Sequence, residues 1–251
     1  MLAGDTTRLT FPTVSILKRV GRRIFSTRVQ RWLRRAGGVD LGDLRHTEPV
    51  SREFGADRGQ PICRWYIDRF LAQQEQKIRG KVLEVAENSY TRRFGGERVT
   101  ESAVLHATAG NPQATLVGDL QSGEGIPEQA YDAAILTQVL QCVFDVGPAV
   151  RTIHRALVPG GTALVTVPAI APVSQYDVER WGEYWHFTPQ SVARLFEPVF
   201  GAENVRVTAF GNSVVAHAYL AGMAAEELHE RELLPYDPDF PIVIAAVATR
   251  R

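Results

Sequence analysis

The chain has 251 residues, of which 45% are hydrophobic and 22% are charged, so a sizeable core is expected and disorder is not. Acidic and basic residues balance at 28 each, which excludes a protein that binds nucleic acid through bulk positive charge. The sequence has no run of about 18 apolar residues and does not begin with the basic-then-apolar order of a secretory signal. Its two cysteines lie far apart, so we expect a cytoplasmic protein in a reducing compartment.

Residues 1–60 differ in character from the rest. The first 45 residues hold ten bases and three acids, and residues 14–35 place apolar side chains at helical spacing among arginines. Residues 42–60 are polar and rich in turn formers. We therefore predict a basic helical extension or cap over residues 1–60. Its helix could contact an anionic membrane surface, cover a second copy in a homodimer, close over the active site, or be only a solvated helix.

From residue 61 onward, helical patterns alternate with short apolar runs typical of buried strands. Because such an alternation predicts parallel strands joined by helices, the expected fold class is α/β. We expect a Rossmann-like, doubly wound, mostly parallel seven-stranded sheet with an N-terminal helical cap, and one domain over residues 61–251. Helices are predicted at 64–77, 148–157, 191–200 and 213–228, and strands at 81–85, 98–100, 114–117, 133–136, 162–167, 204–209 and 241–249.

Acidic residues are expected at the ends of three successive strands. Glu84 lies in the first strand, Glu101 follows the second, and Asp119 follows the third. Glu101 comes 17 residues after Glu84, close to the spacing at which an acid binds a ribose diol in dinucleotide-binding folds. The alternative is that these are solvated loop acids or helix caps. A G-x-G-x-x-G loop is absent, which counts against a nicotinamide dehydrogenase, and no residue cluster has metal-ligand spacing.

The chain resembles the class I S-adenosylmethionine-dependent methyltransferases from about residue 64 to the end. The resemblance rests on VLEVAENSYTRRFGGERVTES, VGDL, YDAAILTQVLQCVFD and RALVPGGTALVTVP, taken in this order and spacing. It implies S-adenosyl-L-methionine as the cofactor. Glu84 takes the acid position of the family's first motif, and Glu101 would bind the ribose hydroxyls. Asp119 and Leu120 would lie near the adenine, and Gln138 would line the methyl region.

The first motif departs from the family's alternating glycines, because Ala86, Asn88 and Tyr90 stand in their places. Glycine allows a sharp turn and a close approach of the backbone to a ligand. Asparagine can adopt a left-handed conformation and could cap the following helix. Tyr90 must either point away from the ligand or stack on it.

The variant segment NSYTRRFGG is similar to that of bacterial methyltransferases of glycan or natural-product biosynthesis. Under this resemblance Tyr90, Thr91 or Arg93 would hold the methionine carboxylate. The alternative is that the arginines pair with Glu87 or Glu97 at the surface.

The acceptor site is expected from the N-terminal cap and from the long loop over residues 168–188. The loop is rich in aromatic rings, which suit a sugar or a flat natural-product scaffold. His186 is the candidate general base, because an imidazole can take a hydroxyl proton near neutral pH; it could also only brace the loop. The expected substrate-binding residues are Tyr176, Trp181, Tyr184 and Trp185.

The sequence thus predicts a methyltransferase that transfers a methyl group to the hydroxyl of a small-molecule acceptor, with neither nucleic acid nor metal as a partner. The alternative keeps the fold and changes the reaction. Because the motif glycines are lost, the protein could bind the cofactor or another ligand and catalyse a cyclisation or isomerisation, or serve as a non-catalytic partner.

Overall fold

The structure, a computed structural model, describes residues 45–251, and Glu48–Arg251 form one compact unit. The basic helix predicted over residues 14–35 lies outside the described residues, and the division of the chain at residue 60 stays a prediction. Residues 48–60 belong to the compact unit, where the Val50 amide donates to the Ala221 carbonyl at 2.8 Å. Within residues 45–251, no helix is long and apolar enough to cross a membrane.

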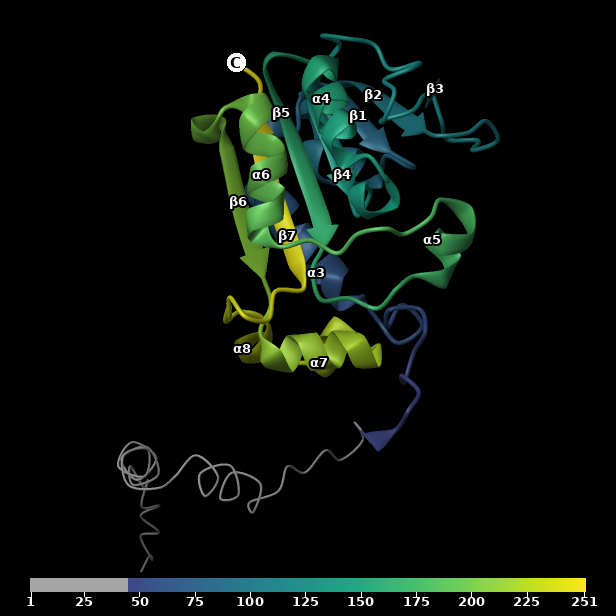
Figure 1. The fold of residues 1–251 in the computed structure, drawn as a ribbon, viewed down its shortest axis with the longest axis vertical. Coiled ribbons are helices and arrows are strands. Elements are labelled where there is room, and N and C mark those ends of the chain that lie inside the picture. Colours follow the sequence, from purple (N-terminus) through teal and green to yellow (C-terminus); the bar gives the residue numbers. More distant parts are fainter. Residues whose placement is uncertain (1–44) are drawn as a thin grey trace, which may run out of the picture. The chain divides into compact units, whose positions relative to one another are not determined.

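An open sheet of seven strands forms the centre of this unit (Figure 1). Its order is β3-β2-β1-β4-β5-β7-β6, with β1 to β5 parallel and β7 antiparallel to both of its neighbours. The strand order reverses between β1 and β4, and doubly wound folds bind ligands at the carboxyl ends of such a pair. The predicted Rossmann-like sheet is confirmed. The strands are β1 (Gly80–Val85), β2 (Val99–His106), β3 (Leu116–Val117), β4 (Tyr131–Thr137), β5 (Leu157–Pro168), β6 (Val205–Phe210) and β7 (Val243–Thr249).

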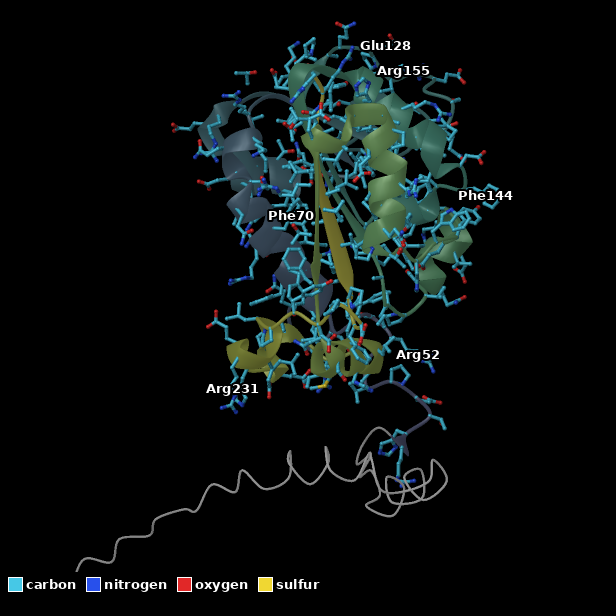
Figure 2. All side chains as sticks on the ribbon, turned by 60° about the vertical axis from the view of Figure 1, so that its left-hand side comes forward. Arg52, Phe70, Glu128, Phe144, Arg155 and Arg231 are labelled. Atoms are coloured by element: carbon cyan, nitrogen blue, oxygen red, sulfur yellow. The ribbon has the colours of Figure 1, made fainter. Side chains whose placement is uncertain are left out.

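Helices cover both faces of the sheet, because successive side chains of a strand point to opposite sides. On β4, buried Ile135 packs in one hydrophobic cluster with α3 and α7, while its neighbour Leu136 packs in the other with α4 and α6. Phe70 of α3 is buried against the sheet, whereas Phe144 stands exposed (Figure 2). The helices are α3 (Ile62–Gln73), α4 (Val146–Ala156), α5 (Gln175–Arg180), α6 (Pro189–Phe200), α7 (Ser213–Ala221) and α8 (Glu230–Leu233).

The second strand is longer than predicted, and this changes the position of Glu101. β2 continues to His106, so Glu101 is its third residue and does not follow its end. It lies beside Lys81 near the start of β1, and the two side chains form an ion pair at 2.8 Å. The prediction that Glu101 lies at a strand end is wrong. The polar run Thr100–Ser102 lacks the apolar pattern of a buried strand, so the sequence does not reveal that β2 continues through it. Residues 100–102 are largely solvent-facing, and only Val104 and Leu105 are fully buried.

The helix predicted over residues 213–228 ends early. α7 closes at Gly222, which adopts a left-handed conformation with φ of 81° and donates to the carbonyl of Tyr219 at 3.1 Å. Glycine is the residue that enters this conformation without cost, so the helix ends at it.

Candidate functional site

Glu84 holds the loop that follows β1. The residue is 2% exposed, and its two carboxylate oxygens accept hydrogen bonds from the backbone amides of Tyr90 at 3.2 Å and Thr91 at 2.7 Å. Burial raises the pKa of Glu84 above its ordinary value. Thr91 is 1% exposed, so it too is packed inside the loop. Glu84, the acid of the first motif, therefore stabilises the conformation of this loop through hydrogen bonds to its backbone.

The loop makes a sharp turn at Ala86, where the family has glycine. Ala86 has φ of 73°, a left-handed conformation that costs an L-residue about 1–2 kcal/mol. Two hydrogen bonds hold it there: its amide donates to the Leu105 carbonyl at 2.9 Å, and its carbonyl accepts from Asn111 Nδ2 at 2.7 Å. The turn that glycine would provide is thus kept by tertiary contacts.

Asn88 does not cap the following helix, contrary to one expectation for it. Its side-chain amide donates to Ser102 Oγ on β2 at 3.0 Å, and its φ is not positive. The backbone N–H groups of Glu87 and Asn88 bond to no other residue in the described part of the chain. Free backbone donors at the carboxyl end of β1 suit a ligand that offers oxygen acceptors.

The side chain of Tyr90 turns toward α3. It is 8% exposed, and its hydroxyl accepts from Arg64 Nη1 at 3.0 Å. Arg93 instead points to the surface, where it pairs with Asp68 of α3 at 2.7 Å and not with either of the two acids expected. The guanidinium group placed against this loop is therefore that of Arg64, a residue to which the sequence motifs assign no role.

Asp119 and Leu120 follow β3 as predicted, but the aspartate binds its own turn. Its carboxylate accepts from the amides of Gln121 at 2.8 Å and Ser122 at 3.3 Å. These backbone hydrogen bonds lower the pKa of Asp119. Leu120 is 8% exposed and packs in the core cluster beneath it.

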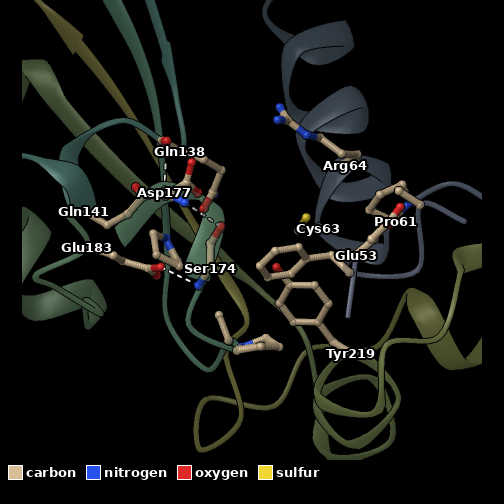
Figure 3. Close-up of a pocket in the computed structure, with 15 residues that line it drawn as sticks. Glu53, Pro61, Cys63, Arg64, Gln138, Gln141, Ser174, Asp177, Glu183 and Tyr219 are labelled. Carbon is tan, nitrogen blue, oxygen red and sulfur yellow. Dashed lines mark hydrogen bonds between the residues drawn. The ribbon is translucent and has the colours of Figure 1, made fainter. Parts of the chain in front are cut away.

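A cavity of 280 Å³ opens where β4 and β5 end (Figure 3). Gln138, the first residue after β4, has φ of 55° and lies in its wall, next to the loop in which Gln141 follows. The segments 48–60 and 168–183 also contribute to its lining; that they form an acceptor site stays a prediction. The lining residues are Glu53, Phe54, Ala56, Pro61, Cys63, Arg64, Gln138, Gln141, Pro168, Ala171, Pro172, Ser174, Asp177, Glu183 and Tyr219.

One wall of the cavity is polar and buried. The Glu183 side chain is 7% exposed; its Oε2 accepts from the Ser174 amide at 2.6 Å, and its Oε1 lies 3.4 Å from His186 Nε2. Gln138, Gln141, Ser174 and Glu183 lie together on this side in Figure 3, opposite Arg64 and Tyr219. Two of these side chains, those of Gln138 and Gln141, carry a buried atom that has no hydrogen-bond partner among the described residues.

The aromatic residues predicted to bind the substrate lie outside this cavity. Tyr176 is 63% exposed, and the ring of Trp181 meets that of His106 edge-on with centroids 5.0 Å apart. The ring of Tyr184 meets that of the exposed Phe144 edge-on, and the ring of Trp185 is tilted against it. His186 is not in the cavity wall either and approaches it only through Glu183. Their roles in binding and proton transfer stay predictions.

Several residues of the cavity carry no signal in the sequence. Arg64 and Cys63 lie in the first turn of α3, and Tyr219 lies in α7, where a helical pattern alone predicts packing. Burial raises the pKa of both Cys63 and Tyr219 above their ordinary values. Glu183 lies in sequence between the aromatic residues of the predicted acceptor loop. That position is the one sequence feature that could have marked Glu183 as a site residue.

Comparison with known proteins agrees with this architecture. Residues 79–165 match a family model described as a methyltransferase domain, a range that runs from β1 into β5. Together with the sheet order, this match assigns the chain the class I S-adenosylmethionine-dependent methyltransferase fold, and the resemblance found in its motifs is confirmed. A search of curated proteins gave no match.

Three solved structures that are similar to this chain are the following. An S-adenosylmethionine-dependent methyltransferase from Mesorhizobium loti is 15% identical, with 75% of this chain and 98% of that chain covered and a TM-score of 0.49. The [4+2]-cyclase SpnF is 15% identical, with 77% and 83% covered and a TM-score of 0.48. A Haemonchus contortus phosphoethanolamine N-methyltransferase, in complex with phosphomonomethylethanolamine and S-adenosylhomocysteine, is 12% identical, with 73% and 52% covered and a TM-score of 0.49.

Proposed function

We propose that this protein is an S-adenosylmethionine-dependent methyltransferase that acts on the hydroxyl of a small molecule, a sugar or a natural-product scaffold. The proposal rests on the position of Arg64, which contacts both the loop after β1 and the cavity. Its guanidinium bonds to Tyr90 in the loop after β1, and the same residue lines the cavity at the ends of β4 and β5. A cofactor loop and an acceptor cavity are thus adjacent.

The residues present fit the cofactor. The free amides of Glu87 and Asn88 and the guanidinium of Arg64 are donors for a carboxylate, and Gln138 lies where the methyl region is expected. S-adenosylmethionine would supply a methyl group on a sulfonium that needs no further activation. The chain's own task is then to position an acceptor hydroxyl and exclude competing water, which can account for most of the rate enhancement.

The cavity limits the size of the acceptor group. Its 280 Å³ lies just below the range of about 300–1,000 Å³ found for small-molecule sites. A single sugar ring fits this space better than an extended scaffold does. His186 stays the proposed general base for the hydroxyl proton, with Glu183 between it and the cavity.

Titration calorimetry with S-adenosylmethionine and S-adenosylhomocysteine tests the cofactor. Arg64→Ala is expected to weaken binding about 10- to 100-fold, since a hydrogen bond to a charged group contributes about 1.5–3 kcal/mol. Glu101→Ala is the matched control and is expected to leave binding unchanged, because Glu101 pairs with Lys81 away from the site.

Absence of binding to either cofactor form would refute the proposal. Product analysis separates methyl transfer from the alternative reaction, because each methylated product must be accompanied by one S-adenosylhomocysteine. A converted acceptor without that by-product would indicate cyclisation or isomerisation on the same fold.

A further inference from the structure

The walls of the cavity carry an excess of negative charge. Three carboxylates line it, those of Glu53, Asp177 and Glu183, against the single guanidinium of Arg64. Arg64 is already bonded to Tyr90 on the opposite side from Asp177 and Glu183 (Figure 3). The carboxylates on the polar wall therefore have no lysine or arginine as a partner among the residues that line the cavity.

The side chain of Glu183 is largely buried. With 7% of its side chain exposed, it has one backbone donor, Ser174 N at 2.6 Å, and one side-chain neighbour, His186 at 3.4 Å. A buried carboxylate is costly unless hydrogen bonds or a positive charge compensate it. The second oxygen of Glu183 is a strong acceptor with only a long contact.

An independent observation at the same wall concerns Gln141. The residue is 5% exposed, and its Nε2 donates to the Gln138 carbonyl at 2.9 Å, which fixes the orientation of the amide. Its Oε1 is buried and has no partner within the described residues. The backbone amide of Tyr184 donates to the Gln141 carbonyl at 2.8 Å, so the loops that carry Gln141 and Glu183 are held side by side. The wall thus presents the acceptors Gln141 Oε1 and Glu183 Oε1, next to one unpaired donor, Gln138 Nε2, which suits a hydroxyl oxygen.

We propose that the acceptor molecule carries a protonated amino group, which donates hydrogen bonds to Glu183 and Gln141 while Asp177 adds negative charge nearby. This rests on the proposed function, because it names the class of the acceptor: a small amino alcohol or amino sugar. A protonated amine has no lone pair and cannot take a methyl group. The held amine is therefore a recognition group, and a neighbouring hydroxyl is the atom that is methylated.

The test measures binding of matched pairs by ligand-observed NMR, with S-adenosylhomocysteine present. The probes are glucosamine against glucose, and 2-aminoethanol against ethylene glycol. Each amine is expected to bind about tenfold or more tightly than its neutral partner, as for a charge-assisted hydrogen bond. Glu183→Gln is expected to remove this preference, because the amine then loses its charged acceptor.

Glu179→Gln is the matched control, because Glu179 lies on the same helix α5 as Asp177 and is exposed outside the cavity. Should Glu183→Gln fail to fold, Asp177→Asn replaces it, with a smaller reduction of the same preference expected. Equal affinities within both pairs in the wild type, or an amine preference that survives the substitutions, would overturn the proposal. Calorimetry with S-adenosylhomocysteine alone reports separately on the cofactor, so the two proposals fail in different measurements.

Discussion

Both carboxylate oxygens of Glu84 are bound to the backbone, so this residue acts on the ligand site through the loop it holds. The burial that raises its pKa also shields these hydrogen bonds from water. Ala86 is likewise held by distant partners, because two hydrogen bonds stabilise the left-handed conformation that a glycine would adopt without them. At the scale of single residues, the loop is built by partners that are distant in sequence.

Glu84→Gln is expected to lower the free energy of unfolding by about 1–3 kcal/mol, because a carboxamide offers one acceptor and leaves one buried N–H unpaired. Urea denaturation measures the change. Glu87→Gln is the control, since Glu87 is exposed and its substitution should cost less than about 0.5 kcal/mol. Equal effects of the two substitutions would contradict the role assigned to Glu84.

Ala86→Gly is expected to raise the stability of the folded protein by up to about 1 kcal/mol. Glycine removes the left-handed strain of about 1–2 kcal/mol but gains about 0.4–1 kcal/mol of freedom in the unfolded chain. Affinity for S-adenosylhomocysteine should be kept or improved. A clear loss of stability in thermal denaturation would show that Ala86 is not strained.

At the scale of elements, residues 48–60 are attached to the end of α7 and the turn beyond it. A Cβ on Gly222 would overlap the backbone of Ser51, so only glycine allows the two segments to approach. Arg58 Nε donates to Glu227 Oε2 at 3.0 Å, and Glu227 also accepts from the Ala224 amide at 2.8 Å. The segment that brings Glu53 to the cavity is fixed by these contacts.

Gly222→Ala is expected to destabilise the protein by at least about 1 kcal/mol more than Gly160→Ala. Both glycines have similar positive φ, 81° and 83°, but a Cβ on Gly160 would meet nothing within 4 Å. The pair thus separates the cost of the backbone conformation, about 1–2 kcal/mol, from the cost of the clash with Ser51. Urea denaturation of both variants gives the difference, and similar values would argue against close packing at Ser51.

The contribution of Glu227 to stability is expected to depend on pH. Its hydrogen bonds to Arg58 lower its pKa from 4.5 to about 2, so the folded state favours the ionised form. This stabilisation is fully present above pH 4.5 and is lost as the pH falls toward 2. The urea midpoints of unfolding of the wild type and Glu227→Gln should therefore differ at pH 7 and converge below pH 4.5.

Glu97→Gln is the exposed control, and its difference in midpoint from the wild type should not depend on pH in this way. A difference between the wild type and Glu227→Gln that stays constant with pH would refute the stabilising role of the ionised Glu227.

At the scale of the whole molecule, two hydrophobic clusters on the two faces of the sheet support the fold, and their members among the described residues lie between Phe54 and Ala248. Among residues 45–251, those that line the cavity begin at Glu53. Within this described part of the chain, core and candidate site both lie in Glu48–Arg251.

A chain that begins at Glu48 is therefore expected to unfold in one cooperative transition and to bind S-adenosylhomocysteine with the affinity of the full chain. Denaturation and calorimetry of the two proteins side by side provide the measurement. Loss of the cooperative transition, or a tenfold weaker affinity, would show that the first 47 residues complete the fold or the site.

The sequence by itself determined the fold, because the alternation of apolar strands and helices and the acid of the first motif are local patterns. It also predicted the loop after β1 as the cofactor site and residues 168–188 as part of the acceptor site, and these two assignments stay predictions. It misplaced Glu101, because the polar start of β2 resembles a loop until its pairing with β1 is known. Only the tertiary structure decided that Arg64 and Glu183 line the cavity, whereas Arg93 and the aromatic side chains of the acceptor loop do not. The physical reason is that a side chain's partners are set by the packing of distant segments, while strand and helix periodicity depends on near neighbours alone.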